Sequence, residues 1–166
     1  PQQWHLRNTG QGGGTAGEDV NIESIWDTYL GSTNEVIAVV DDGLEIAHQD
    51  LAPNVIAGLS FNYVNATADP TPASGADGHG TSVAGVAAAR GFNGLGVTGA
   101  APSAGLVGLN YLANSTTTNE ADALSRSSQT IDIYSNSWGP ADGGTSLDPL
   151  ASFTDSTLAS RVANGR

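Results

Sequence analysis

The sequence predicts an α/β fold built on a doubly wound parallel β-sheet. Residues 36–40 and 105–110 are short apolar runs between polar residues, which is typical of buried parallel strands. A third strand is expected at 131–137. Stretches that favour helix, at 79–89 and 119–124, lie between these strands. This alternation predicts helical crossovers on a parallel sheet.

The first 34 residues are expected to form an N-terminal arm and a short helix, ahead of a sheet core over residues 35–166. Glycine is frequent as far as Gly17, so this part of the arm is expected to be a loop. Asp19 then opens a stretch with apolar residues at helical spacing as far as Tyr29. Gly31 closes this stretch, which predicts a short helix with an acidic start.

The first strand stops abruptly at Asp41 and Asp42. A carboxylate at the carboxyl end of a central parallel strand lies where open α/β sheets place their sites. Residues 45–50 are expected to form a polar loop. Residues 61–76, rich in Asn, Thr, Pro and Ala, are expected to be a long connection from strand to helix.

Very small residues dominate the helix predicted at 79–89, and Ala is a strong helix former. The helix can begin at His79, which places this side chain at the positive end of the helix dipole. Gly78 and Gly80 keep bulk away from the ring on both sides. The alternative is a buried helix with an incidental histidine at its start.

The last segment, 149–166, is predicted to be helical and to end at Asn164-Gly165. Its expected buried face carries Leu150, Phe153, Leu158, Arg161 and Val162.

The composition is strongly acidic, with 17 Asp and Glu against five basic residues, all of them Arg, and a formal charge of −12. This charge argues against nucleic acid as a partner, because little in the chain could neutralise phosphates. It fits cation binding, attraction of basic substrates or plain solubility. The 166 residues contain no Cys and no apolar run near the ~20 residues of a membrane span, so no membrane partner is expected.

Two of these features combine into a candidate catalytic pair. Asp41 ends the first strand, and His79 begins the helix 38 residues later, enough for one crossover and a return to the sheet. The order Asp, His, then Ser is found in one class of serine hydrolase. The sequence therefore predicts that the Asp41 carboxylate contacts the His79 imidazole.

Three longer motifs make a resemblance specific. They are Gln3-Trp4-His5-Leu6, Asp41-Asp42-Gly43-Leu44 with His79-Gly80-Thr81-Ser82-Val83-Ala84-Gly85, and Tyr134-Ser135-Asn136-Ser137-Trp138-Gly139-Pro140-Ala141-Asp142. The chain resembles the subtilisin-like serine proteases over nearly its whole length, most closely the kexin/furin branch. The resemblance implies a secreted serine endopeptidase, extracellular or periplasmic, with Asp41 and His79 in its triad. It also implies that these residues are the N-terminal half of a subtilisin-like peptidase domain, with an incomplete sheet.

The resemblance implies a preference for cutting after Arg or Lys. Asp142 matches an acid that lines the pocket for the residue after which the chain is cut. Asp42 matches an acid that meets the substrate residue one position before it. Glu120 matches an acid that lies further from the cut bond. The backbone of Ser137, Trp138 and Gly139 is expected to pair with extended substrate. Each acid could instead be a solvated turn residue. Ala76 replaces a further Asp of kexin, and Gly143-Gly144 follows Asp142 in place of a further acid, so a single basic residue is expected to suffice.

A structural calcium site is also implied by the resemblance. Calcium takes six to eight oxygen ligands, many of them backbone carbonyls of a bent loop. Asp50 and the Asn93 amide would supply side-chain oxygens, and Arg90, Leu95 and Val97 would supply carbonyls. The alternative is an ordinary surface loop with a solvated Asp50.

The nucleophile of the resembling family lies in a Gly-Thr-Ser-x-Ala run, which these residues do not contain. A downstream piece, carried as a second chain, is expected to supply both the Ser and the missing strands. Arg166 is then a candidate self-cleavage site, and a shortened chain is the alternative. A catalytically inactive relative that binds basic peptides through an acidic cleft is the competing function.

Overall fold

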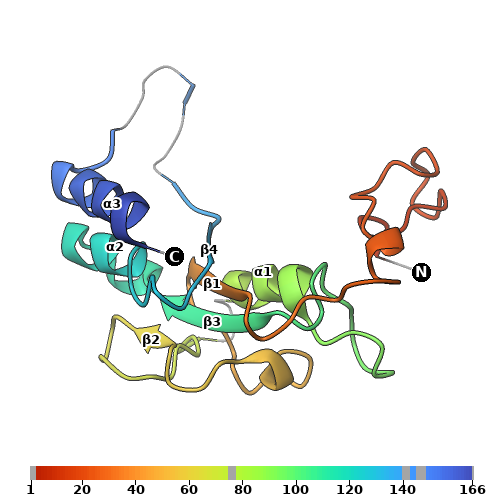
Figure 1. The fold of residues 1–166 in the computed structure, drawn as a ribbon, viewed down its shortest axis with the longest axis horizontal. Coiled ribbons are helices and arrows are strands. Elements are labelled where there is room, and N and C mark those ends of the chain that lie inside the picture. The colour runs from red at the N-terminus through yellow and green to blue at the C-terminus, as the bar shows by residue number, and fades with distance from the viewer. Residues whose placement is uncertain (1–2, 75–77, 140–142, 145–148, 166) are drawn as a thin grey trace.

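The computed structural model describes residues 3–74, 78–139, 143–144 and 149–165 (Figure 1). Asp142, Ala76 and Arg166, which the sequence singled out, lie outside the described residues. In chain order, the helices and strands are η1 (Glu23–Ile25), β1 (Val36–Asp41), η2 (Ala52–Asn54), β2 (Phe61–Asn62), α1 (His79–Ala88), β3 (Gly105–Asn110), η3 (Leu112–Asn114), α2 (Thr117–Ala123), β4 (Ile133–Asn136) and α3 (Ser152–Asn164).

The sheet is parallel throughout and has the strand order β2-β3-β1-β4. Asp41 is in register with Asn110 of β3, and Val40 with Asn136 of β4. The carboxyl ends of three strands therefore meet at one edge of the sheet, with Asp41 in the middle. The parallel α/β architecture expected from the sequence is confirmed.

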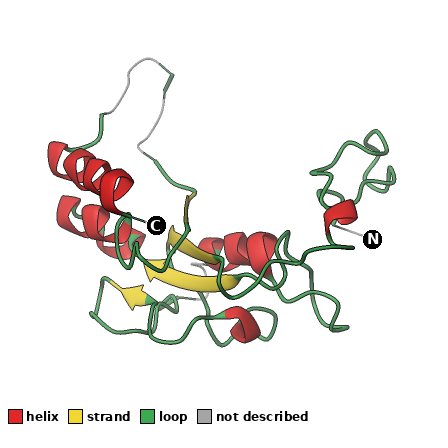
Figure 2. Cartoon of the chain, in the orientation of Figure 1, coloured by secondary structure: helices red, strands yellow, loops and turns green. Residues whose placement is uncertain are grey.

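Side chains of β1 alternate between two apolar layers, one on each face of the sheet. Ala38 and Val40 join a cluster that includes Ala123 of α2 and Ile131. Val39 points to the other face and joins a cluster with Ala84 and Ala88 of α1. Helices thus cover both faces, and α3 lies beside α2 at the end of the molecule away from the arm (Figures 1 and 2). The buried alanines let α1 lie close to the sheet.

The short helix expected between Asp19 and Tyr29 is not formed; only the 3-10 turn η1 lies there. The Asp19 carboxylate accepts the amides of Asn8 and Asn21, so it is not free to cap a helix. Asn21 also has a φ of 55°, which an α-helix does not allow.

Residues 61–76 contain a strand that the sequence did not indicate. Phe61–Asn62 forms the edge strand β2 and pairs with β3 at Leu109 and Asn110. Two residues carry too little pattern to predict a strand. The strand is defined by its pairing to β3, and Phe61 packs against the core from it.

Helix α3 forms where it was expected, but its buried side differs. Thr154 is fully buried, whereas Phe153 and Val162 are 56% and 91% exposed. Leu158 and Arg161 are half-buried. The face against α2 is therefore more polar than expected, because it includes a hydrogen bond from Thr154 to that helix.

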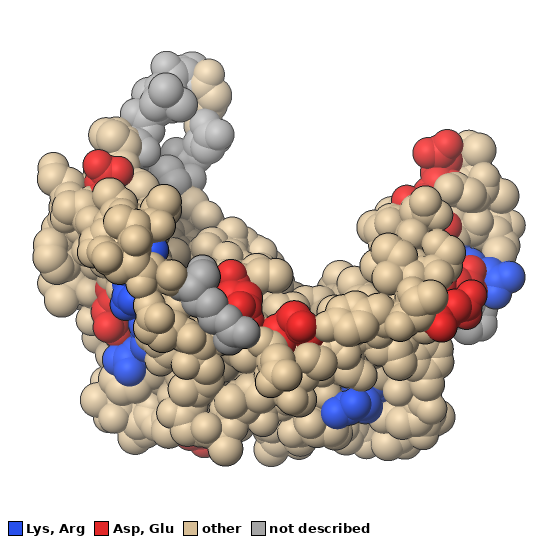
Figure 3. All heavy atoms as spheres, viewed as in Figure 1, with Lys and Arg blue, Asp and Glu red and all other residues tan. Residues whose placement is uncertain are grey.

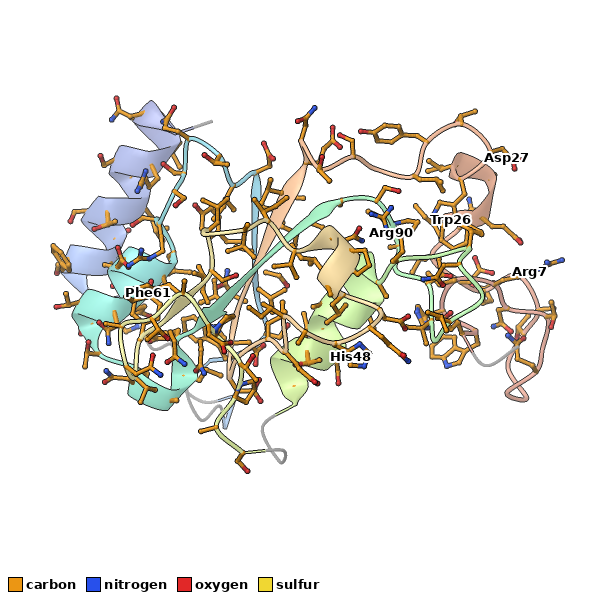
Figure 4. The ribbon with its side chains drawn as sticks, turned by 90° about the horizontal axis from the view of Figure 1, so that it is seen from below. Arg7, Trp26, Asp27, His48, Phe61 and Arg90 are labelled. Carbon is orange, nitrogen blue, oxygen red and sulfur yellow. The ribbon has the colours of Figure 1, made fainter. Side chains whose placement is uncertain are left out.

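Hydrogen bonds tie the arm to the body, among them those of Gln3 and Trp26. The Gln3 amide exchanges hydrogen bonds with Thr98, and the Trp26 indole donates to the Ala100 carbonyl at 2.8 Å. Figure 4 shows Trp26 and Arg90 together on this side of the body. In the space-filling view, the arm and the α3 end rise on either side of a hollow, and acidic side chains outnumber basic ones on this face (Figure 3).

None of the helices in the described part of the chain has the length and apolar character needed to cross a membrane.

Candidate active site

Asp41 ends the central strand β1 and is completely buried. Its backbone carbonyl accepts the Tyr111 amide at 2.9 Å, which fixes the end of the strand. The side-chain oxygen Oδ1 accepts the amide of the next residue, Asp42, at 2.8 Å. Sheet pairing and this bond together hold the carboxylate in one orientation.

His79 is the first residue of α1, and its ring meets this carboxylate. The Nδ1 atom lies 2.8 Å from Oδ1 and 3.0 Å from Oδ2 of Asp41. The expected contact between the two side chains is therefore present. A neutral imidazole that donates from Nδ1 carries its free lone pair on Nε2, and the His79 side chain is 57% exposed. This is the arrangement of a base oriented by a buried carboxylate.

The pKa of His79 is raised above its usual value of 6.5. The main cause is the hydrogen bond to Asp41, followed by the negative charge of Asp41 and, more weakly, that of Asp42. Partial burial opposes these effects. These contacts stabilise the imidazolium form, which is the form a histidine takes after it accepts a proton as a general base.

Asp42 lies beside the pair, but its carboxylate faces the backbone of α1. Its Oδ2 accepts the His79 amide at 3.0 Å, and its Oδ1 accepts the Gly80 amide at 2.8 Å. The helix has no side-chain cap at Gly78, so Asp42 caps it from 37 residues away. Sequence reasoning missed this contact, because capping signals are read from residues adjacent to a helix.

Trp138 follows β4 and closes the sheet edge next to the pair. Its indole Nε1 donates to the Val40 carbonyl at 2.8 Å, and its ring packs against Tyr111 with a centroid separation of 5.0 Å. Ser137 and Gly139 on either side are exposed.

Glu120 lies on α2, apart from the pair. Its Oε2 accepts a 2.9 Å hydrogen bond from the buried Thr154 of α3. The negative charge of Glu120 helps to raise the pKa of Tyr111, for which burial is the larger cause. This carboxylate connects the two helices, a role that its position in the sequence did not predict.

The expected calcium-loop residues 90–97 follow the C-terminal end of α1, and Asp50 contacts this loop. Asp50 is 3% exposed, and its Oδ2 accepts the Val97 amide at 2.8 Å. Its Oδ1 is buried and has no hydrogen-bond partner among the described residues. The loop encloses this side chain so closely that a Cβ on Gly96 would collide with its carboxylate.

The other members of the expected ligand set are on the same loop. The Arg90 amide donates to the Asp50 carbonyl, and the Asn93 side chain accepts the Leu95 amide at 3.0 Å. No cluster of three or more His, Asp or Glu side chains suited to a metal occurs within the part of the chain that the structure describes. A cation here would therefore depend on Asp50 and on backbone carbonyls. That mixture of donors fits calcium, and an unpartnered buried carboxylate oxygen fits a cation.

The structure thus brings Asp41, Asp42 and His79 into one group at the sheet edge, with Trp138 beside it. Glu120 lies on α2 and Asp50 in a separate loop, and Asp142 is outside the described residues.

Two named proteases are similar in sequence to nearly the whole chain. Neuroendocrine convertase 2 of Sus scrofa is 36% identical over 99% of the chain, and the dibasic-processing endoprotease of Schizosaccharomyces pombe is 39% identical over 99%. The chain spans only 27% and 23% of the length of these two relatives.

Solved structures of serine proteases are also similar to the chain. The serine protease of Aeromonas sobria matches 95% of the chain with a TM-score of 0.81 and 40% identity, over 28% of its own length. A cold-adapted subtilisin-like serine proteinase, at 20% identity and a TM-score of 0.59, shares the fold over 82% of the chain and 45% of its own. The model of the subtilase family matches residues 32–165, so the chain belongs to the subtilase family.

Proposed function

We propose that this chain is the Asp- and His-bearing part of a serine endopeptidase that cuts peptide bonds after Arg or Lys. The observation that carries the proposal is the 2.8 Å contact between Nδ1 of His79 and the buried Asp41 carboxylate, at the carboxyl edge of a parallel sheet. Membership of the subtilase family and the likeness to a convertase and a dibasic-processing endoprotease support it.

In this proposal the Ser nucleophile comes from a segment outside these 166 residues. Nε2 of His79 takes the hydroxyl proton as the oxygen attacks the scissile carbonyl, and the peptide C–N bond breaks as His79 returns that proton to the leaving amine. Water then repeats the sequence to release the acyl group. Asp41 keeps the Nδ1 proton in place and stabilises the imidazolium formed in both steps.

The preference for basic residues rests on charge and on similarity. The chain carries a net charge of −12, which would attract cationic peptides to its surface. Glu120, Asp42 and Asp142 are the proposed acids of the substrate cleft, with the backbone of Ser137 to Gly139 pairing with the peptide. One charge-assisted hydrogen bond to a substrate is worth about 1.5–3 kcal/mol, or roughly 10- to 100-fold in specificity.

We also propose a structural calcium ion held by Asp50, Asn93 and the carbonyls of Arg90, Leu95 and Val97. The unpartnered Oδ1 of Asp50 is the observation in favour. The ion would supply the missing positive charge and order the loop, and it would take no part in the chemistry. Secretion to an extracellular or periplasmic compartment is proposed from the same family likeness.

A cleavage assay of the full-length protein tests the proposal. Three peptides that differ only in the residue before the scissile bond, Arg, Lys or Phe, are compared. Cleavage after Arg and Lys, at least roughly 10-fold faster than after Phe, is expected. The H79Q variant, which keeps a polar side chain of similar size, controls for contaminating protease. Tight binding of the Arg peptide without cleavage would instead support the inactive, peptide-binding relative.

A further inference from the structure

Asp42 holds an unusual position between the two members of the pair. Its amide donates to Oδ1 of Asp41 at 2.8 Å, and its carboxylate accepts the amides of His79 and Gly80 at 3.0 and 2.8 Å. Three hydrogen bonds of Asp42 thus link the Asp41 carboxylate to the backbone of the first two residues of α1. The contact between the His79 side chain and Asp41 completes a closed cycle of hydrogen bonds.

Helix α1 has little else to hold its first turn. Gly78 provides no side-chain cap, and the first turn contains no acidic residue of its own. The amides of a first turn lack partners within the helix, so an external acceptor stabilises them, and a negative charge also suits the helix dipole. Asp42 supplies both from the loop after β1.

Close backbone packing makes this contact sensitive to position. A Cβ on Gly80 would lie 2.2 Å from the Gly43 carbonyl oxygen and 2.8 Å from Cβ of Asp41. The start of α1 therefore rests directly on residues 41–43. A small shift of the helix start would move the His79 ring relative to Asp41, since the ring sits on the first residue of that helix.

We propose that Asp42 is a positioning residue, which clamps the first turn of α1 so that the His79 imidazole meets Asp41. The inference rests on the proposed peptidase function for its kinetic consequences, but the clamp itself is a property of the fold. This role is additional to the contact with basic substrates proposed above for Asp42, and it differs from that contact because it acts on every substrate alike. Among the described residues, the charged groups acting on His79 are Asp41 and Asp42.

The kinetic experiment uses D42N in the full-length enzyme, with E45Q as the matched control. Glu45 is an exposed acid near the same helix turn, and its backbone amide donates a hydrogen bond to the Thr81 hydroxyl. E45Q, like D42N, replaces a carboxylate with an amide. An Asn keeps only one acceptor oxygen, so one cap bond is lost. A misplaced catalytic group is expected to lower kcat by up to roughly 10²-fold, with KM little changed. E45Q is expected to match wild type.

Two substrates, with Lys or Ala before the cut residue, separate positioning from substrate recognition. The clamp predicts a loss of kcat in D42N with both peptides. A loss confined to the Lys peptide would overturn the inference and leave Asp42 as a recognition residue. Circular dichroism checks the fold, and D42S, whose shorter neutral side chain removes the charge and leaves a single acceptor oxygen, carries the same comparison if D42N does not fold.

An NMR titration of the histidine ring provides a readout that does not need activity. Loss of the Asp42 charge and of the clamp is expected to lower the pKa of His79 in D42N but not in E45Q, with H79Q used to assign the signal. An unchanged pKa together with an unchanged kcat would overturn the inference. A wild-type enzyme that cleaves no peptide would refute the proposed function, while the titration would still test the clamp.

Discussion

Asp41 and Asp50 are both buried aspartates, one at the end of β1 and one in the segment after it, yet their surroundings differ. Both carboxylate oxygens of Asp41 have partners within the chain, from Asp42 and His79. Asp50 uses Oδ2 for the Val97 amide, while its Oδ1 has no partner in the described part of the protein. An unpaired buried carboxylate oxygen is costly. The protein therefore completes the first site itself, whereas we propose that a cation completes the second.

The D41N substitution tests the first half of this comparison and has the largest expected effect. An amide in place of the carboxylate favours the wrong tautomer of His79, and turnover is expected to fall by roughly 10⁴-fold, the loss measured for this change in a serine protease. The measurement is kcat of the full-length enzyme on an Arg peptide. A kcat within 10-fold of wild type would contradict the assigned role.

The pH dependence of activity provides a second test of the Asp41–His79 pair. A general base must be neutral, and Asp41 raises the pKa of His79 above 6.5, so the acidic limb of kcat/KM should lie above that pH. In D41N the main cause of the raised pKa is gone, and the limb should move to lower pH. A limb that stays in place would show that another group controls it.

The D50N substitution tests the second half. Calcium at 100 times its dissociation constant is expected to stabilise wild type by about 2.7 kcal/mol, seen as a higher Tm than in chelator. D50N is expected to lose most of this gain, because the charge that faces the cation is removed. D27N, a change at an exposed arm residue (Figure 4), is the control and should keep the full gain. An equal calcium response in D50N would contradict the proposed site.

Glu120 extends the comparison to a carboxylate with a single side-chain partner, and here the smallest effect is expected. T154V keeps the shape of a buried side chain but removes its hydrogen bond to Glu120, at a cost of about 1 kcal/mol in the free energy of unfolding. T157V is the matched control, since the Thr157 hydroxyl donates to the Phe153 carbonyl of its own helix rather than to α2. Urea unfolding measures both, and equal values would show that the link between α2 and α3 adds no stability.

The parts of the fold that sequence alone predicted are those with local patterns. Strands β1 and β3 are continuous apolar runs, and α1 is a run of small helix formers, so each was located closely. The contact between Asp41 and His79 could be predicted because Asp41 ends a strand and His79 begins the helix. The alternation of strands and helices made the parallel direction of the strands predictable as well.

The parts that were missed depend on partners far along the chain. Strand β2 exists because β3 offers it a backbone edge, and the cap of α1 comes from Asp42 rather than from a residue beside the helix. In the arm only the 3-10 turn η1 forms, because Asp19 bonds to Asn8 and the positive φ of Asn21 interrupts the expected helical stretch. Contacts of this kind leave no periodic or local signal in the sequence.

Labelling with a fluorophosphonate tests the central claim most directly, because only an activated serine reacts. We expect the full-length protein to be labelled on one Ser outside these 166 residues. We also expect H79Q and D41N to slow the reaction by orders of magnitude, since triad residues act as a unit. Labelling of H79Q at the wild-type rate, or no labelling of the wild-type protein, would contradict the claim that Asp41 and His79 activate a nucleophile.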